Sequence, residues 1–305
     1  MIIKEKDSKQ AEIDELTSLL SLPLPDNKKF LIERELRFLK SGDRGENDSA
    51  YFINFYYAAS KNWAIIHDLR LEHNDRVAQI DHLLINRFFN IFVLESKNFC
   101  YGVKITDNGE FLVQFNNSFF AIESPIEQNK RHIVVIESVI KDFDIMPKRL
   151  GLTIMPAFKS YVLVAPKSRL IRPRKSNFDT SMVIKADMLT TSIEKAIEAM
   201  KPLSLLASAS KISSSETLKE IAEDIASFHK PMKIDYRNRF SIRATPSPKQ
   251  ISSQAPETYE AKRFYCSKCK ITITEKVARF CWDNKHRFGG KAYCFDCQKA
   301  FTGRH

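Results

Sequence analysis

The stretch IFVLESKNFCYG, residues 91–102, places charged residues directly after an apolar run. The four residues before Glu95 are all apolar, which is typical of a buried β-strand. Glu95 and Lys97 lie two positions apart, so in a strand their side chains point to the same face. Burying a carboxylate and an ammonium removes their hydration, which is costly unless another group compensates for it. We therefore expect a function at the end of this strand.

A third charged residue, Asp81, interrupts the apolar stretch VAQIDHLLIN, residues 77–86. We expect this stretch to be a strand that pairs with the one carrying Glu95. Two carboxylates close together in a poorly hydrated site repel each other unless a cation lies between them. Mg²⁺ and Mn²⁺ prefer such oxygen ligands, and Lys97 would lie beside the ion, where it could orient an attacking water or offset phosphate charge. The residues thus predict a metal and phosphate site.

A structural alternative stays open at this stage. Glu95 and Lys97 could form a salt bridge, with Asp81 accepting a hydrogen bond from a backbone group. A single Glu-x-Lys pair is a weak signal by itself. The order of Asp81 and this pair on consecutive predicted strands favours the metal site.

The surrounding patterns predict a mixed α/β fold. Strands are expected at WAIIHDLRL (63–71), at the two stretches above and at FKSYVLVAP (158–166), with turns at EHND and RFFN and a hairpin at DNG. A helix is expected from Pro125, capped by Ser124, and another at TTSIEKAIEAM (190–200). Consecutive strands followed by alternating helices and strands indicate a mixed sheet flanked by helices.

The N-terminal part is expected to be helical. Two helical patterns between residues 11 and 40 are separated by SLPLPDN, whose prolines end a helix. A further helix is predicted to start near Glu46. Its aromatic residues recur at helical spacing and are predicted to face the core; they are Tyr51, Phe52, Phe55 and Tyr56.

Four of these motifs together resemble the nuclease-related domain (NERD) branch of the PD-(D/E)XK nuclease superfamily. The matching segments are GDRGE (42–46, with Gly42, Gly45 and Glu46), QIDHLL (79–84), ESKN (95–98) with Gly102, and SPIEQNKRHI (124–133) with Gln128. They are similar, in order, to the opening Gly-x-x-Gly-Glu, the central strand, the Glu-x-Lys-Asn block and the Pro-x-x-Gln helix of that domain. The resemblance covers roughly residues 40–145 and keeps its acidic and lysine positions.

The resemblance implies a nuclease-like fold and metal-dependent hydrolysis of nucleic acid. It implies that Asp81 and Glu95 bind Mg²⁺ or Mn²⁺, and that Glu46 contributes from the first helix. It also implies that Lys97 activates water and that Gln128 steadies the site or the substrate. No catalytic role is expected for the histidines of this region, because two carboxylates and a lysine suffice; these are His67, His73, His82 and His132.

The C-terminal part carries two Cys-x-x-Cys pairs, Cys266 with Cys269 and Cys294 with Cys297. Two such pairs are typical of a closed, structural Zn²⁺ site, although the 24 residues between them exceed the usual spacing of about 15 to 20. A unit of about 45 residues builds little core, so metal binding is expected to drive its folding.

Two points about this unit stay open. Cys281 or His286 could replace one of the four ligands, or Cys281 could be a buried apolar residue, as we expect of Cys100. Aromatic residues also alternate with cations between the pairs; they are Phe280, Trp282, Phe288 and Tyr293. Such a pattern suits stacking on single-stranded nucleic acid, and it suits equally the filling of a small core.

The positive charge of the chain is concentrated in this part. The net charge is +11, and residues 230–305 hold 17 Lys and Arg against 6 Asp and Glu, whereas residues 1–229 hold 31 of each sign. Localised positive charge indicates a polyanionic partner, most often nucleic acid. A solubilising tail is the alternative.

These observations predict an order of five segments. They are an N-terminal helical segment (1–38), a nuclease-like domain (39–200), a helical extension (201–230), a flexible Ser/Pro/Gln linker (231–260) and a basic zinc ribbon (261–305). Neither a membrane-spanning run nor the apolar stretch of a signal peptide is present, so we expect a cytoplasmic protein without a membrane partner.

The sequence favours a metal-dependent nuclease with two kinds of ion, Mg²⁺ or Mn²⁺ for catalysis and Zn²⁺ for structure. We expect its partner to be DNA more than RNA; possible protein partners are left open. One alternative is a non-catalytic nucleic-acid-binding or regulatory protein on the same fold. Another is a zinc-dependent adaptor for a second protein.

Overall fold

The computed structural model describes residues 1–115, 118–174, 178–200, 212–242 and 264–301. The chain divides into two compact units, Met1–Ala244 and Thr245–His305, here called the body and the cysteine unit. Within the described ranges, no helix combines the length and the apolar character that a membrane span requires.

The body is built on a six-stranded sheet with the strand order β1-β2-β3-β4-β10-β12. The strands are β1 (Ile2–Lys4), β2 (Trp63–His73), β3 (Arg76–Asn86), β4 (Asn90–Lys97), β10 (Ala157–Val164) and β12 (Val183–Lys185). The β2–β3 and β3–β4 pairs are antiparallel, and β1, β10 and β12 join in parallel. The predicted mixed α/β fold is thus confirmed.

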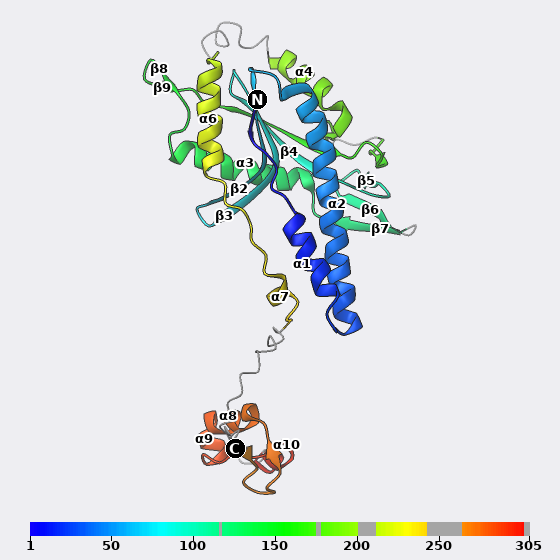
Figure 1. Ribbon diagram of the computed structural model, residues 1–305, viewed down its shortest axis with the longest axis vertical. Coiled ribbons are helices and arrows are strands. Elements are labelled where there is room, and N and C mark those ends of the chain that lie inside the picture. Colours follow the sequence, from blue (N-terminus) through cyan, green and yellow to red (C-terminus); the bar gives the residue numbers. More distant parts are fainter. Residues whose placement is uncertain (116–117, 175–177, 201–211, 243–263, 302–305) are drawn as a thin grey trace, which may run out of the picture. The chain divides into compact units, whose positions relative to one another are not determined.

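Helices cover both faces of this sheet (Figure 1). On one face α2 (Asp26–Tyr57) and α4 (Leu189–Met200) pack against β2, β3 and β4. On the other face α3 (Pro125–Asp142) and α6 (Ser215–Ser227) bury the alternate residues of the same strands. The helix α3 begins as predicted, with Pro125 in its first turn and the Ser124 side chain accepting a hydrogen bond from the Glu127 backbone N–H.

The N-terminal helices differ from prediction in one respect. The break at SLPLPDN is confirmed, because α1 (Gln10–Leu20) ends there and α2 begins at Asp26. The expected helix start near Glu46 is wrong, since α2 runs without interruption from Asp26 to Tyr57. Glu46 therefore lies in the middle of a long helix.

Of the four aromatic residues of α2 that were predicted to face the core, Phe52 packs against it, but the prediction is wrong for the other three. Tyr51, Phe55 and Tyr56 are 64%, 70% and 52% exposed. The buried row of this helix consists instead of residues spaced by four, which are Gly45, Ser49, Ile53 and Tyr57. Two of them are small, and the close approach that they permit turns this row, not the aromatic one, toward the sheet.

A second sheet of four short strands lies beside the first, in the order β11-β5-β6-β7. Its members are β5 (Val103–Ile105), β6 (Phe111–Phe115), β7 (Ser118–Ile122) and β11 (Leu170–Ile171). The predicted hairpin at DNG is confirmed, because β5 and β6 pair antiparallel around it. A further two-stranded pair consists of β8 (Lys148–Arg149) and β9 (Leu152–Thr153).

The body extends further along the chain than predicted. The helix α7 (Tyr236–Arg239) lies within the expected linker, yet Tyr236 is buried against Leu16 and Leu19 of α1. An aromatic residue with such a docking site does not behave as linker, so the predicted linker start at residue 231 is wrong. The rest of the predicted linker, residues 243–260, lies outside the described residues, as do residues 201–211 of the predicted extension.

The cysteine unit combines one hairpin with short helices. It contains β13 (Phe264–Tyr265), β14 (Thr272–Ile273), α8 (Glu275–Asp283), α9 (Lys285–Phe288) and α10 (Phe295–Gln298). Its core is small and includes Ala278, Cys281 and Phe288 together with Cys266 and Cys294.

Candidate active site and metal centre

The central strands bring the two predicted metal-binding carboxylates together. In the β3–β4 pair His82 lies opposite Leu94, which makes Asp81 and Glu95 the next residues along. The backbone N–H of Ser96 donates to Asp81 Oδ2 at 2.7 Å. Glu95 is 3% exposed, although it is a carboxylate, and its side chain is on the sheet face that α3 covers.

The strand next to Asp81 is locally distorted. On β2, His67 pairs with His82 and Leu69 pairs with Ile80, while Asp68 between them has a φ of 51°. Non-glycine residues rarely adopt this left-handed conformation, and it often marks a functional site. Asp68 is buried, and Lys9 Nζ lies 3.5 Å from its Oδ2. The sequence did not reveal Asp68, because HDL looks like an ordinary strand and a positive φ leaves no trace in it.

Lys97 connects β4 to α3. Its Nζ donates to Glu95 Oε1 at 2.7 Å and to Gln128 Oε1 at 3.2 Å. Burial lowers the pKa of Lys97, but Glu95, Asp81 and Glu46 outweigh burial and raise this pKa above its usual value. The ammonium therefore remains protonated at neutral pH.

Glu46 reaches the site because α2 packs tightly on the end of β4. A Cβ at Gly45 would lie 2.8 Å from the Cβ of Asn98, so only glycine permits this approach. The Asn98 amide also donates to the Ser41 carbonyl at 3.1 Å. The glycine of GDRGE and the asparagine of ESKN thus form one helix–strand contact. Lys6 Nζ lies 3.2 Å from Glu46 Oε2, however, and pairs with this carboxylate.

The three carboxylates oppose one another electrostatically. Burial raises the pKa of Asp81 well above its usual value, and the charges of Glu95 and Glu46 raise it further. Burial also raises the pKa of Glu95 despite Lys97, and the pKa of Glu46 despite Lys6. Holding these groups ionised at neutral pH is unfavourable, and a bound cation would relieve this repulsion.

The donor set fits a hard divalent cation. Glu95 Oε2 is buried and has no hydrogen-bond partner, so this oxygen is available as a ligand. Carboxylate oxygens are the ligands that Mg²⁺ and Mn²⁺ prefer. Within the described part of the chain, three or more potential ligand atoms converge only at the cysteines, so the acidic site offers two close carboxylates and not three.

The contacts expected if these residues had only a structural role are present as well. Glu95 and Lys97 form a salt bridge, and Asp81 accepts a backbone hydrogen bond. These contacts account for Glu95 Oε1 and Asp81 Oδ2 but leave Glu95 Oε2 unpaired. The metal-binding and catalytic roles of the five residues stay predictions.

One histidine for which the sequence predicted no catalytic role borders the acidic site. His132 Nδ1 is buried without a hydrogen-bond partner and lies 3.7 Å from Glu95 Oε2. Burial, together with Lys97 and Arg131, lowers the pKa of His132 to about 4, so the ring is neutral. His132 and Gln128 also line a cavity of about 690 Å³ next to the site.

Two further histidines form a chain of buried hydrogen bonds next to the acidic site. His67 Nδ1 and His82 Nδ1 are 2.8 Å apart, His67 Nε2 lies 3.0 Å from Asn54 Oδ1, and His82 Nε2 lies 3.1 Å from Ser96 Oγ. With His67 Nε2–H donating to Asn54, His67 Nδ1 must accept from His82, and the Ser96 hydroxyl must donate to His82. This chain of hydrogen bonds connects α2 to β4 beside Glu95.

The four predicted cysteine ligands converge in the cysteine unit. The Sγ atoms of Cys266, Cys269, Cys294 and Cys297 all lie within 4.8 Å of one another. The first pair lies between β13 and β14, and Cys294 forms the N-cap of α10. Burial raises the pKa of Cys266, but backbone N–H groups of Cys269, Cys294 and Lys268 outweigh burial and bring it to about 6. The hydrogen bond with Cys294 raises the pKa of Cys297 to about 12, so a tetrahedral metal ion that binds all four sulfurs would displace protons from them.

Cys281 and His286, the alternative ligands, both lie outside the four-cysteine cluster. Cys281 is buried in the core and accepts hydrogen bonds from Tyr293 N and Gln298 Nε2, and His286 is exposed outside the cluster. The predicted burial of Cys100 is wrong, because this residue is exposed. The aromatic residues divide: Phe288 fills the core, while Phe280 and Trp282 are 49% and 36% exposed.

The comparisons with known proteins agree with the geometry in the body. Residues 41–164 match the family model of the nuclease-related domain, NERD. Searches among curated proteins and among solved structures found no match. The matched residues run from α2 to the end of β10 and include the five predicted site residues of the body. This part of the chain, residues 41–164, is therefore similar to the nuclease-related domain family.

Proposed function

We propose that this protein is a metal-dependent nuclease that hydrolyses phosphodiester bonds in nucleic acid, with DNA as the favoured substrate. The observation that carries the proposal is the pair of carboxylates on β3 and β4. Asp81 and Glu95 have raised pKa values, and Glu95 keeps a buried oxygen without a partner beside a protonated lysine. The nuclease-related domain in the same residues supports the proposal.

The acidic and the basic side chains of the site have different roles in this proposal. Asp81 and Glu95 would hold Mg²⁺ or Mn²⁺, and Glu46 would contribute once Lys6 releases it. When bound, the cation supplies Lewis-acid stabilisation of the charge that develops on the phosphoryl oxygens. Lys97 remains protonated, so it stabilises the same charge as a hydrogen-bond donor and does not act as a base. Gln128 fixes the direction of the Lys97 ammonium through its Oε1.

The cysteine unit would hold a structural Zn²⁺ and help to bind the substrate. Its positive charge, with the exposed rings of Phe280 and Trp282, suits a polyanion with accessible bases. Ending the chain after Ala244, at the boundary of the body, removes this unit. We expect weaker and less salt-sensitive binding of nucleic acid, with residual cleavage at high protein concentration. Equal binding by the shortened and full-length proteins would contradict this role.

A cleavage assay tests the proposed activity. Labelled single- and double-stranded DNA and RNA are incubated with the full-length protein, with and without Mg²⁺ or Mn²⁺. We expect cleavage only with metal, and we expect Asp81→Asn to abolish it. Asp48→Asn is the matched control, because Asp48 is an exposed carboxylate on α2 and its substitution removes the same charge. Cleavage by Asp81→Asn at the parent's rate would contradict the assignment.

One observation favours the non-catalytic alternative. Lys6 pairs with Glu46 and also contacts Asp43, so an internal cation occupies one side of the acidic group. A protein that only binds nucleic acid would show no metal-dependent cleavage of any substrate. Under this alternative Lys6→Gln would leave the protein inactive, whereas under the proposed function it would free Glu46 and strengthen the binding of Mg²⁺.

A further inference from the structure

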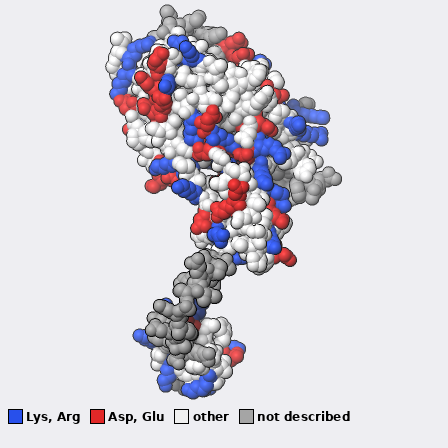
Figure 2. Space-filling model, viewed as in Figure 1, with Lys and Arg blue, Asp and Glu red and all other residues white. Residues whose placement is uncertain are grey.

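Residues 1–229 of the body carry no net charge but contain a dense cluster of cations. Residues 165–174, here called the basic loop, follow β10 and contain four exposed cations and no carboxylate; the cations are Lys167, Arg169, Arg172 and Arg174. On the face of the molecule seen in Figure 2, by contrast, acidic and basic side chains are interspersed over the body.

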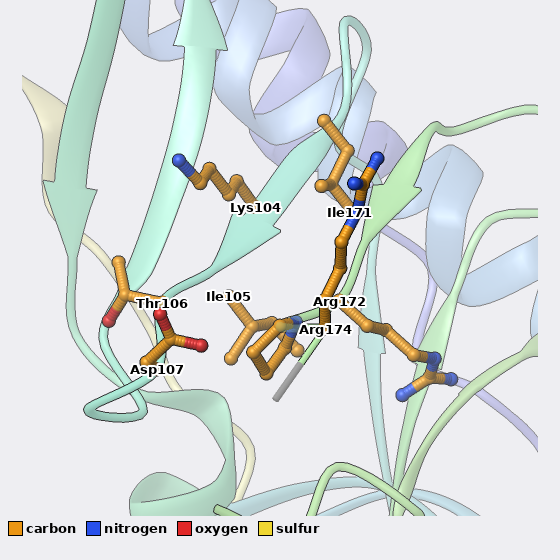
Figure 3. A pocket seen from close by; sticks show the side chains of 8 residues that line it. Lys104, Ile105, Thr106, Asp107, Ile171, Arg172 and Arg174 are labelled. Atoms are coloured by element: carbon orange, nitrogen blue, oxygen red, sulfur yellow. The ribbon is translucent and has the colours of Figure 1, made fainter. Parts of the chain in front are cut away.

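Two of these four cations line a cavity together with Lys104 of β5. Lys104, Arg172 and Arg174 line a space of about 470 Å³, with a single carboxylate, Asp107, at its edge (Figure 3). Among the described residues, neither Lys104 nor any cation of the basic loop forms an ion pair with a carboxylate. Gathered positive charges without carboxylate partners attract an anionic ligand.

The backbone of the basic loop is held firmly in place. Lys185 Nζ donates to the carbonyls of Ala165 and Pro166, at 3.3 and 3.0 Å, and also to that of Ser168. Gly102 has a φ of 119°, and a Cβ there would lie 2.8 Å from the Arg169 carbonyl oxygen. That oxygen also accepts a hydrogen bond from the Val103 N–H at 2.8 Å. The backbone that carries these cations is therefore held in one conformation, which lowers the entropic cost of binding a ligand.

The basic loop starts at the candidate active site. The backbone N–H of Ala165, its first residue, donates to the carbonyl of Lys97 at 3.0 Å. On the other side of the cavity, Lys104 Nζ lies 5.8 Å from the ring centroid of Phe119 on β7. Phe119 and its neighbour Phe120 are 45% and 54% exposed. Cations and exposed rings thus extend away from Lys97 across the second sheet.

We propose that the basic loop, Lys104 and Phe119 form a binding track for a single-stranded segment of nucleic acid that extends from the active site. This proposal rests on the proposed function. The cations contact successive phosphates, and the exposed ring provides a stacking surface for a base, which only an unpaired strand offers. The body then binds the substrate, in addition to the binding by the cysteine unit.

Salt-dependent binding tests the electrostatic half of this proposal. The full-length protein binds a fluorescent oligothymidylate in the absence of divalent cations, and its affinity is measured over a range of salt concentrations. Each lost phosphate contact lowers the salt slope of single-strand binding by about 0.7, so Lys104→Gln with Arg174→Gln is expected to lower it by about 1.4. Arg172 is left unchanged, because its guanidinium donates to the carbonyls of Thr180 and Val183.

The matched control removes two exposed cations elsewhere in the body. Lys61→Gln with Lys195→Gln makes the same change of charge outside the track and is expected to keep the parent's slope. Phe119→Ala is expected to lose about tenfold in affinity with an unchanged slope, because stacking is not electrostatic. Melting temperatures equal to that of the parent show that the variants are folded.

Three results would overturn the proposal. They are an unchanged slope in the Lys104/Arg174 variant, an equal loss of slope in the control, and displacement of the oligonucleotide by thymidine monophosphate or inorganic phosphate at equivalent concentrations. The last result would indicate a pocket for a small anion. No cleavage is measured, so a protein without nuclease activity can still pass this test, and failure here leaves the metal-dependent activity to be judged by its own assay.

Discussion

The acidic site and the cysteine site differ in what holds their ligands in place. Asp81 and Glu95 project from a six-stranded sheet whose strands are packed on both faces by helices. The four cysteines belong to a unit whose core is small and includes two of the ligands themselves. In the body the fold positions the site, whereas in the cysteine unit the site is expected to hold the fold together.

The two sites also differ in how they tolerate the loss of an ion. The acidic site has internal cations, since Lys97 pairs with Glu95 and Lys6 pairs with Glu46. Buried carboxylates with such partners remain in a folded protein at a moderate electrostatic cost. Four converging thiols have no such substitute. The comparison therefore predicts large effects of substitution at the cysteines, and small or even favourable effects at Asp81.

The largest effect is expected at the cysteines. Cys294→Ser should release the metal ion and unfold the cysteine unit, because structural Zn²⁺ contributes about 10–16 kcal/mol to folding in small domains. The body should melt at an unchanged temperature. Cys100→Ser is the control, since Cys100 is exposed and lies outside the cluster. Elemental analysis measures the zinc content, and a purified parent without zinc would contradict the expectation.

Acid is expected to destabilise the body through its buried histidines. Burial lowers the pKa of His67 and of His132 to about 4, from the usual 6.5. Below pH 6.5 the unfolded chain gains protons that the folded protein resists, so each of the two costs about 3 kcal/mol by pH 4. The site carboxylates act in the opposite sense, because their raised pKa values favour the folded state as pH falls.

Replacing one histidine isolates its share of this effect. His132→Gln removes one titrating group from the edge of the acidic site. Urea unfolding at several pH values should give a shallower fall of the free energy of unfolding below pH 6.5 for this variant than for the parent. Identical pH profiles would show that His132 is not held neutral by burial.

A smaller effect is expected from removing the site lysine. Lys97→Met leaves Glu95 buried without its cation, which should cost about 2 kcal/mol at neutral pH, less than for a fully buried pair because Lys97 is 28% exposed. Lowering the pH should recover part of this loss, because Glu95 is then protonated. Thermal melting at neutral and mildly acidic pH measures both effects, and a pH-independent loss would indicate packing alone.

Sequence patterns predicted the features that depend on neighbouring residues. The Ser124–Pro125 helix start, the DNG hairpin and the pairing of the Asp81 and Glu95 strands follow from local propensity and alternation. The match of residues 41–164 to the nuclease-related domain also agrees with motifs that are short and contiguous. The four cysteines converge, as the two Cys-x-x-Cys pairs suggested.

The missed features depend on tertiary contacts. Tyr51 and Phe55 have helical spacing, but the neighbouring row of Gly45 and Ser49 packs more closely and turns them toward solvent. Asp68 joins the acidic site through a backbone conformation that its residue type does not signal. His132 lies near Glu95 only because α3 crosses the end of β4, which no local pattern records.

The melting temperature of Asp81→Asn, with and without Mg²⁺, tests the central claim most directly. Asparagine keeps an oxygen that can accept the hydrogen bond from Ser96 N–H, and it removes one of the repelling charges. The metal-free variant should therefore melt at the temperature of the parent or slightly above it, and Mg²⁺ should stabilise the parent alone. A clearly lower melting temperature for the metal-free variant, together with no effect of Mg²⁺ on the parent, would contradict a metal site at Asp81 and Glu95.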